Sequence, residues 1–222
     1  MKPYLIYLFF FLPILVTLVS NNFSSSSNNT NKTSPNPTIE TVSATDNIIK
    51  IDASQVISSE GIGEVRLGMT YGELKKSLLS EDSKTTFNVK SPFMVDFDAN
   101  AINRNGETLY YILYPATSNF SDSSVIELVL TENPNYRTDK GIGVGTKIKD
   151  AEVAYGKATL GYNTSNEPRE GVSFTNQPAN IYFRPSKSPD NFAGIYKSPL
   201  QEYNETNQFK EDAVIESVMV RK

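Results

Sequence analysis

The sequence contains no cysteine, no histidine and no tryptophan. Without cysteine, the chain has no disulfide framework, no thiolate nucleophile and no cysteine that could carry a lipid anchor. Without histidine, it lacks the commonest general base near neutral pH and the commonest metal ligand. These absences exclude Ser-His-Asp catalysis and His/Cys zinc sites within this chain. The chemistries that remain are carboxylate pairs, a Ser-Lys pair and oxygen-ligand metal sites.

An excess of positive charge is also missing. The 222 residues include 21 Lys and Arg against 25 Asp and Glu, a net charge of −4. Nucleic-acid-binding proteins usually carry a basic face. The composition therefore predicts no nucleic-acid partner, and the length allows one or two domains.

The chain begins with an apolar segment. Residues 4–19 read YLIYLFFFLPILVTLV, and Lys2 precedes them. A short apolar run after a positive residue is typical of a signal peptide, and a membrane span needs about 20 apolar residues. We predict a signal peptide or N-terminal membrane anchor over residues 1–20. The protein is then exported to the periplasm, the cell surface or the extracellular space, and touches a membrane only through residues 4–19 if they are retained.

Residues 21–50 are rich in Ser, Asn, Thr and Pro. Such a composition cannot bury enough apolar surface to offset the entropy lost when a chain becomes ordered. We predict a disordered tether here, extended near Pro35 and Pro37.

The remainder of the chain contains three pairs of similar segments in the same order. GIG recurs at Gly61 and Gly141, VIELVLT at Val125 matches VIESVMV at Val214, and each of the latter follows a strand-like segment, LYYILYP or NIYFRP. Repetition in order indicates an internal duplication. We predict two repeats, residues 51–136 and residues 137–222.

Each repeat begins with a predicted helix. Thr70 and Glu73 match a capping box at the start of the first, and Tyr71, Leu74 and Leu78 form one apolar stripe. The corresponding apolar residues of the second helix are Ile148, Ala151 and Tyr155, with Gly156 as the predicted C-cap.

Predicted strands follow each helix: 94–102, 107–114 and 124–131 in the first repeat, and 171–175, 179–185 and 213–220 in the second. Asn105-Gly106 predicts a tight hairpin between the first two. The predicted fold class is α+β, with two duplicated units. Each unit is a short helix followed by an antiparallel β-meander, with the helices packed on one face of the sheet.

The segments NYRTDKGIGVGTKIKDAEVAYGKA (residues 135–158) and VRLGMTYGELKKSL (residues 65–78) resemble the Gly-x-x-helix openings of small secreted modules. These modules are the β-lactamase-inhibitor-like fold and the BamE/SmpA outer-membrane assembly lipoproteins. The resemblance implies a tandem, non-catalytic module that binds other proteins. The chain departs from the lipoproteins because it has no cysteine to be lipidated.

Two motifs suggest a bound cofactor or metal but fail on detail. Gly141, Gly143 and Gly145 lack the spacing of a nucleotide-binding loop. Asp96, Asp98, Asn100 and Glu107 fall at positions 1, 3, 5 and 12 of a calcium loop, but Ala101 occupies the position that requires glycine. We therefore expect no cofactor and no metal.

A binding surface is predicted on the strands. Tyr110, Ile112 and Tyr114 share one face of their strand, opposite Leu109, Tyr111 and Leu113, and their counterparts in the second repeat are Asn180, Tyr182 and Arg184. Tyr and Arg are enriched in protein-interface hot spots. The predicted protein-binding residues are Tyr110, Tyr114, Tyr182 and Arg184. The alternative is that loops or another layer bury this face.

These observations predict an exported, non-catalytic envelope or surface protein that binds another envelope or extracellular protein, and not an enzyme. Two alternatives remain. One is a structural envelope protein without a defined ligand. The other is a carboxylate-based hydrolase, which would need two carboxyl groups about 5–9 Å apart in a cleft.

Overall fold

A computed structural model describes residues 52–165, 169–185, 191–197 and 201–222. The predicted leader (1–20) and tether (21–50) lie outside the described residues. The elements, in chain order, are the 3-10 helix η1 (Ala53–Gln55), β1 (Val56–Ser58), β2 (Gly61–Ile62), β3 (Val65–Arg66), α1 (Tyr71–Glu81), β4 (Thr86–Met94), β5 (Phe97–Arg104), β6 (Glu107–Pro115), β7 (Leu128–Thr131), β8 (Arg137–Thr138), α2 (Ile148–Tyr155), β9 (Ala158–Asn163), β10 (Gly171–Phe174), β11 (Ile181–Arg184), β12 (Tyr203–Thr206) and β13 (Ser217–Arg221).

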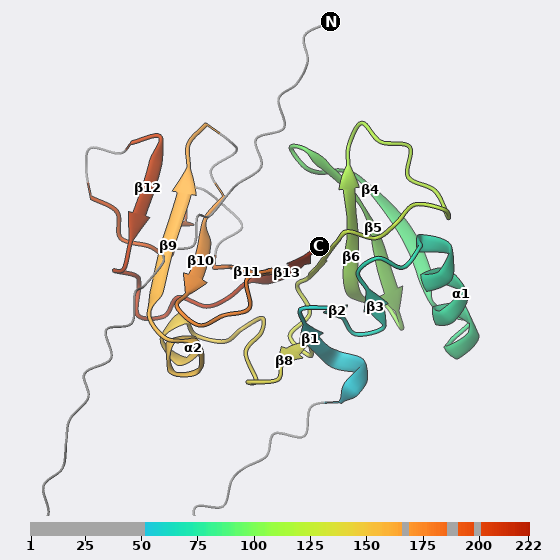
Figure 1. The fold of residues 1–222 in the computed structure, drawn as a ribbon, viewed down its shortest axis with the longest axis horizontal. Helices are drawn as coiled ribbons and strands as arrows, with labels where there is room; N and C mark the ends of the chain where they lie inside the picture. The colour runs from blue at the N-terminus through green and yellow to red at the C-terminus, as the bar shows by residue number, and fades with distance from the viewer. Residues whose placement is uncertain (1–51, 166–168, 186–190, 198–200) are drawn as a thin grey trace, which may run out of the picture. The chain divides into compact units, whose positions relative to one another are not determined.

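The predicted fold class is wrong. The described residues are mostly β, and they contain only two α-helices, α1 and α2. One antiparallel sheet has nine strands in the order β12-β9-β10-β11-β13-β7-β6-β5-β4, and a second, mixed sheet has four in the order β3-β2-β1-β8 (Figure 1). The pairing of β7 with β13 joins strands from both halves into a single sheet. Two separate helix-plus-meander units therefore do not exist, because the halves share one sheet and one core.

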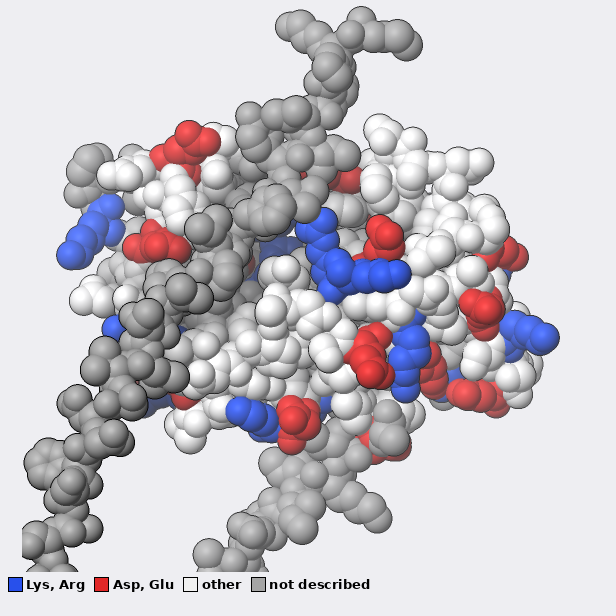
Figure 2. Space-filling view, in the orientation of Figure 1, with Lys and Arg blue, Asp and Glu red and all other residues white. Residues whose placement is uncertain are grey.

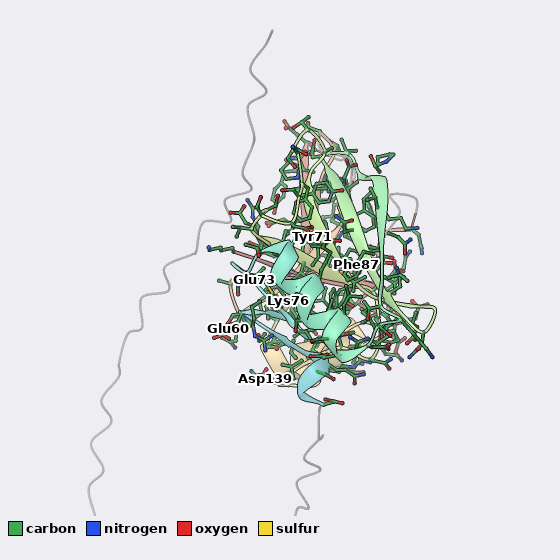
Figure 3. All side chains as sticks on the ribbon, turned by 90° about the vertical axis from the view of Figure 1, so that its right-hand side faces the viewer. Glu60, Tyr71, Glu73, Lys76, Phe87 and Asp139 are labelled. Atoms are coloured by element: carbon green, nitrogen blue, oxygen red, sulfur yellow. The ribbon has the colours of Figure 1, made fainter. Side chains whose placement is uncertain are left out.

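Helix α1 begins as its sequence predicts. The Thr70 hydroxyl accepts the amide of Glu73 at 3.2 Å, and the Glu73 carboxylate accepts the amide of Thr70 at 2.8 Å. This capping box satisfies amides that lack partners in the first turn. Tyr71, Leu74 and Leu78 are buried. In Figure 3, Tyr71 lies near Phe87 of β4, and their rings meet edge to face at 6.2 Å.

Helix α2 follows its predicted stripe as well. Ile148, Ala151 and Tyr155 are its buried residues. It ends at Gly156, whose φ of 83° lies in the left-handed region that glycine adopts at low cost. Neither helix could cross a membrane, since within the described ranges no helix is both long and apolar enough.

The starts of the two helices are held in the same way. Before each helix, main-chain amides and carbonyls bond to the segment that leads into a central strand, β7 or β13. The bonds are Gly68 N to Ile126 O, Ile126 N to Met69 O and Tyr71 N to Ser124 O before α1, and Gly145 N to Ile215 O, Ile215 N to Thr146 O and Ile148 N to Ala213 O before α2. Each helix is thus fixed against the middle of the nine-stranded sheet.

The predicted hairpin at Asn105-Gly106 is confirmed. Both residues have positive φ, 54° and 83°, as a two-residue β-turn of this kind requires, and they join β5 to β6. Strand β4 was not predicted. Its side chains are mostly exposed and show no clean alternation, because β4 is an edge strand. The predicted strand over 94–102 is instead split by a turn at Val95 and Asp96.

The nine-stranded sheet has apolar side chains on both faces. On one face, which we call the helix face, the sheet packs against α1, α2 and the small sheet to form the main core. On the other, which we call the second face, Ala99, Leu113, Leu128 and Leu130 are buried. Phe93, Met94, Phe97, Tyr111 and Met219 pack against them while partly exposed. Burial on both faces accounts for the continuous apolar character of LYYILYP.

Burial of tyrosines predicts how stability depends on pH. Burial, together with the charges of Asp122 and Tyr114, raises the pKa of Tyr71 from 10.0 to about 12. Between these values the unfolded chain loses the proton and the folded chain keeps it. The free energy of unfolding should therefore fall as pH rises through this window. From about pH 6 to 9 it should be flat, because the chain has no His or Cys. Urea titrations from about pH 6 to 12 measure the free energy of unfolding and check both expectations. A strong dependence of this free energy on pH near pH 7 would contradict the expected flat region.

Candidate binding site on the second face

The structure separates the four residues predicted to bind a partner. Tyr110 is wrongly placed by the prediction, because its side chain is 0% exposed in the main core. Its hydroxyl donates to Glu64 Oε2 at 3.1 Å, and its ring meets Tyr136 edge to face. Burial, followed by the charge of Glu64, raises its pKa. Tyr110 is therefore part of the core and not of an open surface.

Tyr114 also lies on the helix face. It stacks on Phe120 with the ring centroids 4.2 Å apart, and Phe120 in turn contacts Tyr71 of α1. Side chains alternate along β6, so Tyr114 shares a face with Ile112, which is fully buried in the main core. The structure thus does not bring Tyr114 together with Tyr182.

Tyr182 and Arg184 do lie on the second face. Met219, opposite Tyr182 on β13, lies opposite Leu130 of β7, which in turn lies opposite Tyr111 of β6. Opposed residues of antiparallel strands share a face, so these four side chains form one row across the sheet. Arg184 is two residues beyond Tyr182 on the same face. We call Tyr111, Leu130, Met219 and Tyr182 the tyrosine row.

The register explains the error in the predicted equivalences. Ile112 lies opposite Val129, and Phe183 lies opposite Val218, and all four are in the main core. The counterpart of Tyr182 is therefore Tyr111 and not Ile112. A shift of one residue moves every side chain to the other face, and both faces of β6 are apolar enough that its sequence alone does not distinguish them.

Arg184 is largely desolvated. Its Nε is buried and has no hydrogen-bond partner, and the residue opposite is Ser217. Burial lowers the pKa of its guanidinium, while the charges of Glu132 and Glu216 oppose this change. Glu132 also accepts a hydrogen bond from the Tyr111 hydroxyl at 3.5 Å. Arg184 thus presents an incompletely satisfied guanidinium beside the tyrosine row.

A second arginine, which the sequence reading did not single out, lies close by. Burial lowers the pKa of Arg169, the charge of Arg184 lowers it further, and the charge of Asp96 raises it. Arg169 precedes β10, and Asp96 lies in the turn between β4 and β5. In Figure 1, β4–β6 stand on one side and β9 and β10 on the other, with β11 and β13 running between them. The charges of Arg184 and Asp96 both act on Arg169, so the end of β11 and the β4–β5 turn lie near the segment that precedes β10.

The tyrosine row has the side-chain chemistry of a protein interface. Tyr, Met and Arg are enriched in such interfaces, and aromatic rings gain contact area at a small entropic cost. Phe93 extends the row, since its ring lies 4.7 Å from that of Tyr111. No family model, curated protein or solved structure matches the chain. The resemblance to secreted binding modules therefore stays a prediction.

The described residues contain no preformed group of side chains that could hold a metal ion. No three Asp or Glu side chains in the described ranges gather as metal ligands would. Of the calcium-like positions, Asp96 lies in a turn, Asp98 lies opposite Tyr114 in β5, and Asn100 is buried. A paired strand cannot wrap its side chains around one ion in the way a calcium loop does.

One recess contains two carboxylates. It measures about 180 Å³ and is lined by residues that include Glu64, Arg104, Glu107 and Tyr136. Glu64 already accepts a hydrogen bond from Tyr110 and contacts Arg104 at 3.4 Å. These contacts give Glu64 a structural role, because they tie it to Tyr110 of β6 and to Arg104 of β5.

Proposed function

We propose that the protein is an exported, non-catalytic binding module that docks another envelope or extracellular protein on the second face of its large sheet. The observation that carries the proposal is the Nε of Arg184, which is buried without a hydrogen-bond partner beside the half-buried Tyr111, Met219 and Tyr182 of the tyrosine row. The partner segment that fits this surface is apolar and carries a carboxylate.

The energetics favour a protein ligand. A carboxylate of the partner can accept a hydrogen bond from the buried Nε of Arg184, and a charge-assisted bond of this kind is among the stronger ones. The half-buried rings of Tyr111 and Tyr182 supply apolar contact area on rigid strands. A charged hydrogen bond framed by aromatic side chains is the usual composition of an interface hot spot.

The test is site-specific photo-crosslinking in the native envelope of the source cell. A photoreactive residue at Tyr182 should form an adduct with one protein. The same residue at Val153, which is 89% exposed on α2, should not. Arg184→Gln should weaken capture of that protein by about 2 kcal/mol or more, roughly thirtyfold in affinity, because it removes the charge that pairs with the partner.

The control is the thermal stability of the Arg184→Gln variant, which shows whether it still folds. Arg184→Gln loses the interaction of its charge with Glu132 and Glu216 but no hydrogen bond of its Nε, so it should lower the thermal midpoint by only about 5 °C or less. Absence of an adduct at Tyr182, or an adduct whose yield does not respond to Arg184→Gln, would contradict a partner site on this face.

A further inference from the structure

A separate recess of about 480 Å³ lies where the two sheets meet. It is lined by Ser59, Glu60, Arg66, Leu67, Asn180, Arg221 and Lys222. These residues come from the turn between β1 and β2, the end of β3, the residue before β11 and the end of β13. Arg221 is four residues along β13 from Ser217, the neighbour of Arg184, so the recess is about 13 Å from the arginine pair.

Within the described ranges, no carboxylate lies at ion-pair distance from the cations of the recess, Arg66, Arg221 and Lys222. Figure 2 shows blue side chains gathered near the middle of the view, where Figure 1 places the C-terminal end of β13. Three cations and a single acidic side chain around one recess are unexpected in a chain of net charge −4.

Hydrogen bonds fix the main chain around the recess. Asn180 Nδ2 donates to the carbonyl oxygens of Ser59 at 2.7 Å and Arg221 at 3.2 Å, which ties the turn between β1 and β2 to the end of β13. The amide of Lys222 donates to the carbonyl of Glu127 at 2.9 Å. Arg66 Nη1 donates to the carbonyl of Gly63 at 2.6 Å. These bonds hold the main chain that carries the cations.

We propose that this recess binds a phosphate group. Three cationic side chains line it against one acidic side chain, that of Glu60, so positive side-chain charge is in excess. A phosphate monoester carries about −1.5 to −2 charges near neutral pH and offers three strong acceptor oxygens. The guanidinium of Arg221 can pair with two of its oxygens. Arg66 can donate through the nitrogens that do not bond to Gly63 and Val65, and the ammonium of Lys222 supplies a further point charge. The inference is independent of the proposed protein-binding function.

The first test titrates inorganic phosphate into the full chain and follows backbone amide signals by NMR. Saturable shifts should centre on Glu60, Asn180 and Lys222. The double variant Arg221→Gln with Lys222→Gln should weaken the binding about tenfold or more, since two charged hydrogen-bond donors are lost. The matched control is Lys90→Gln with Lys149→Gln. It makes the same change in charge at exposed sites elsewhere and should bind as the unmodified chain does.

A second arm distinguishes free phosphate from a lipid headgroup. The full chain is mixed with vesicles of phosphatidylglycerol or of phosphatidylcholine. Any contribution from the apolar residues 4–19 is common to both, so the difference between the vesicles reports on the recess. A preference for phosphatidylglycerol that the recess variant removes and the control keeps assigns the ligand to a headgroup. Saturable shifts with inorganic phosphate and no such preference assign it to a soluble phosphate. Absence of both effects, or equal effects of the two double variants, would overturn the proposal.

Discussion

Replacing Phe183 by alanine should lower the free energy of unfolding by about 3–5 kcal/mol. The side chain is 1% exposed and packs in the main core, with its ring 5.6 Å from Phe174 and 6.0 Å from Tyr155. Removing it leaves a cavity that the surrounding strands and α2 cannot close without moving. Urea denaturation of the full chain measures the loss from the midpoint and the slope.

The matched control is the adjacent residue of the same strand. Tyr182→Ala should cost roughly 1 kcal/mol, because the ring is half-buried on the second face and its removal opens no closed cavity. Together the two variants test which face of β11 is the core. If Tyr182→Ala is as damaging as Phe183→Ala, the second face is covered in the folded protein and the proposed docking surface is wrong.

Replacing Glu170 by alanine is the second change for which we expect a large effect, about 3 kcal/mol of stability. Its carboxylate is 1% exposed and accepts three hydrogen bonds: from the amides of Ala193 and Gly194 at 2.7 Å each, and from the Tyr196 hydroxyl at 2.8 Å. The alanine variant leaves these donors without an acceptor, and unsatisfied buried donors are costly. Chemical denaturation measures the loss.

A smaller change at the same site separates the contribution of the tyrosine hydroxyl from that of the two amides. Tyr196→Phe removes one donor and leaves the carboxylate bonded to the two amides, so it should cost about 1 kcal/mol. Limited proteolysis should show earlier cleavage within residues 191–197 for Glu170→Ala than for Tyr196→Phe, because the carboxylate fixes that segment. Equal stability of Glu170→Ala and the unmodified chain would show that these hydrogen bonds do not hold the segment.

The proposed docking surface contains residues that the sequence did not indicate. Tyr111 and Met219 belong to the second face and Arg169 lies near Arg184, but none of the three was predicted to be functional. Tyr111 was not singled out because both faces of its strand are apolar in the sequence. Met219 could have been found from its alternation with Val218 and Val220, both buried. Arg169 lies between Pro168 and Glu170 in the sequence, and only the tertiary structure brings Asp96 and Arg184 near it.

The sequence by itself determined the features that depend on nearby residues. The capping box of Thr70 and Glu73, the apolar stripes of both helices and the turn at Asn105-Gly106 involve hydrogen bonds or contacts within a few positions, so local patterns predict them. The absence of cysteine and histidine likewise excludes whole classes of chemistry without reference to the fold. Only the tertiary structure decided the rest. The β7–β13 pairing merges the halves into one sheet, and its register places Tyr182 outward and Phe183 inward. Strand partners far apart in the sequence set that register, and a shift of one residue reverses every face.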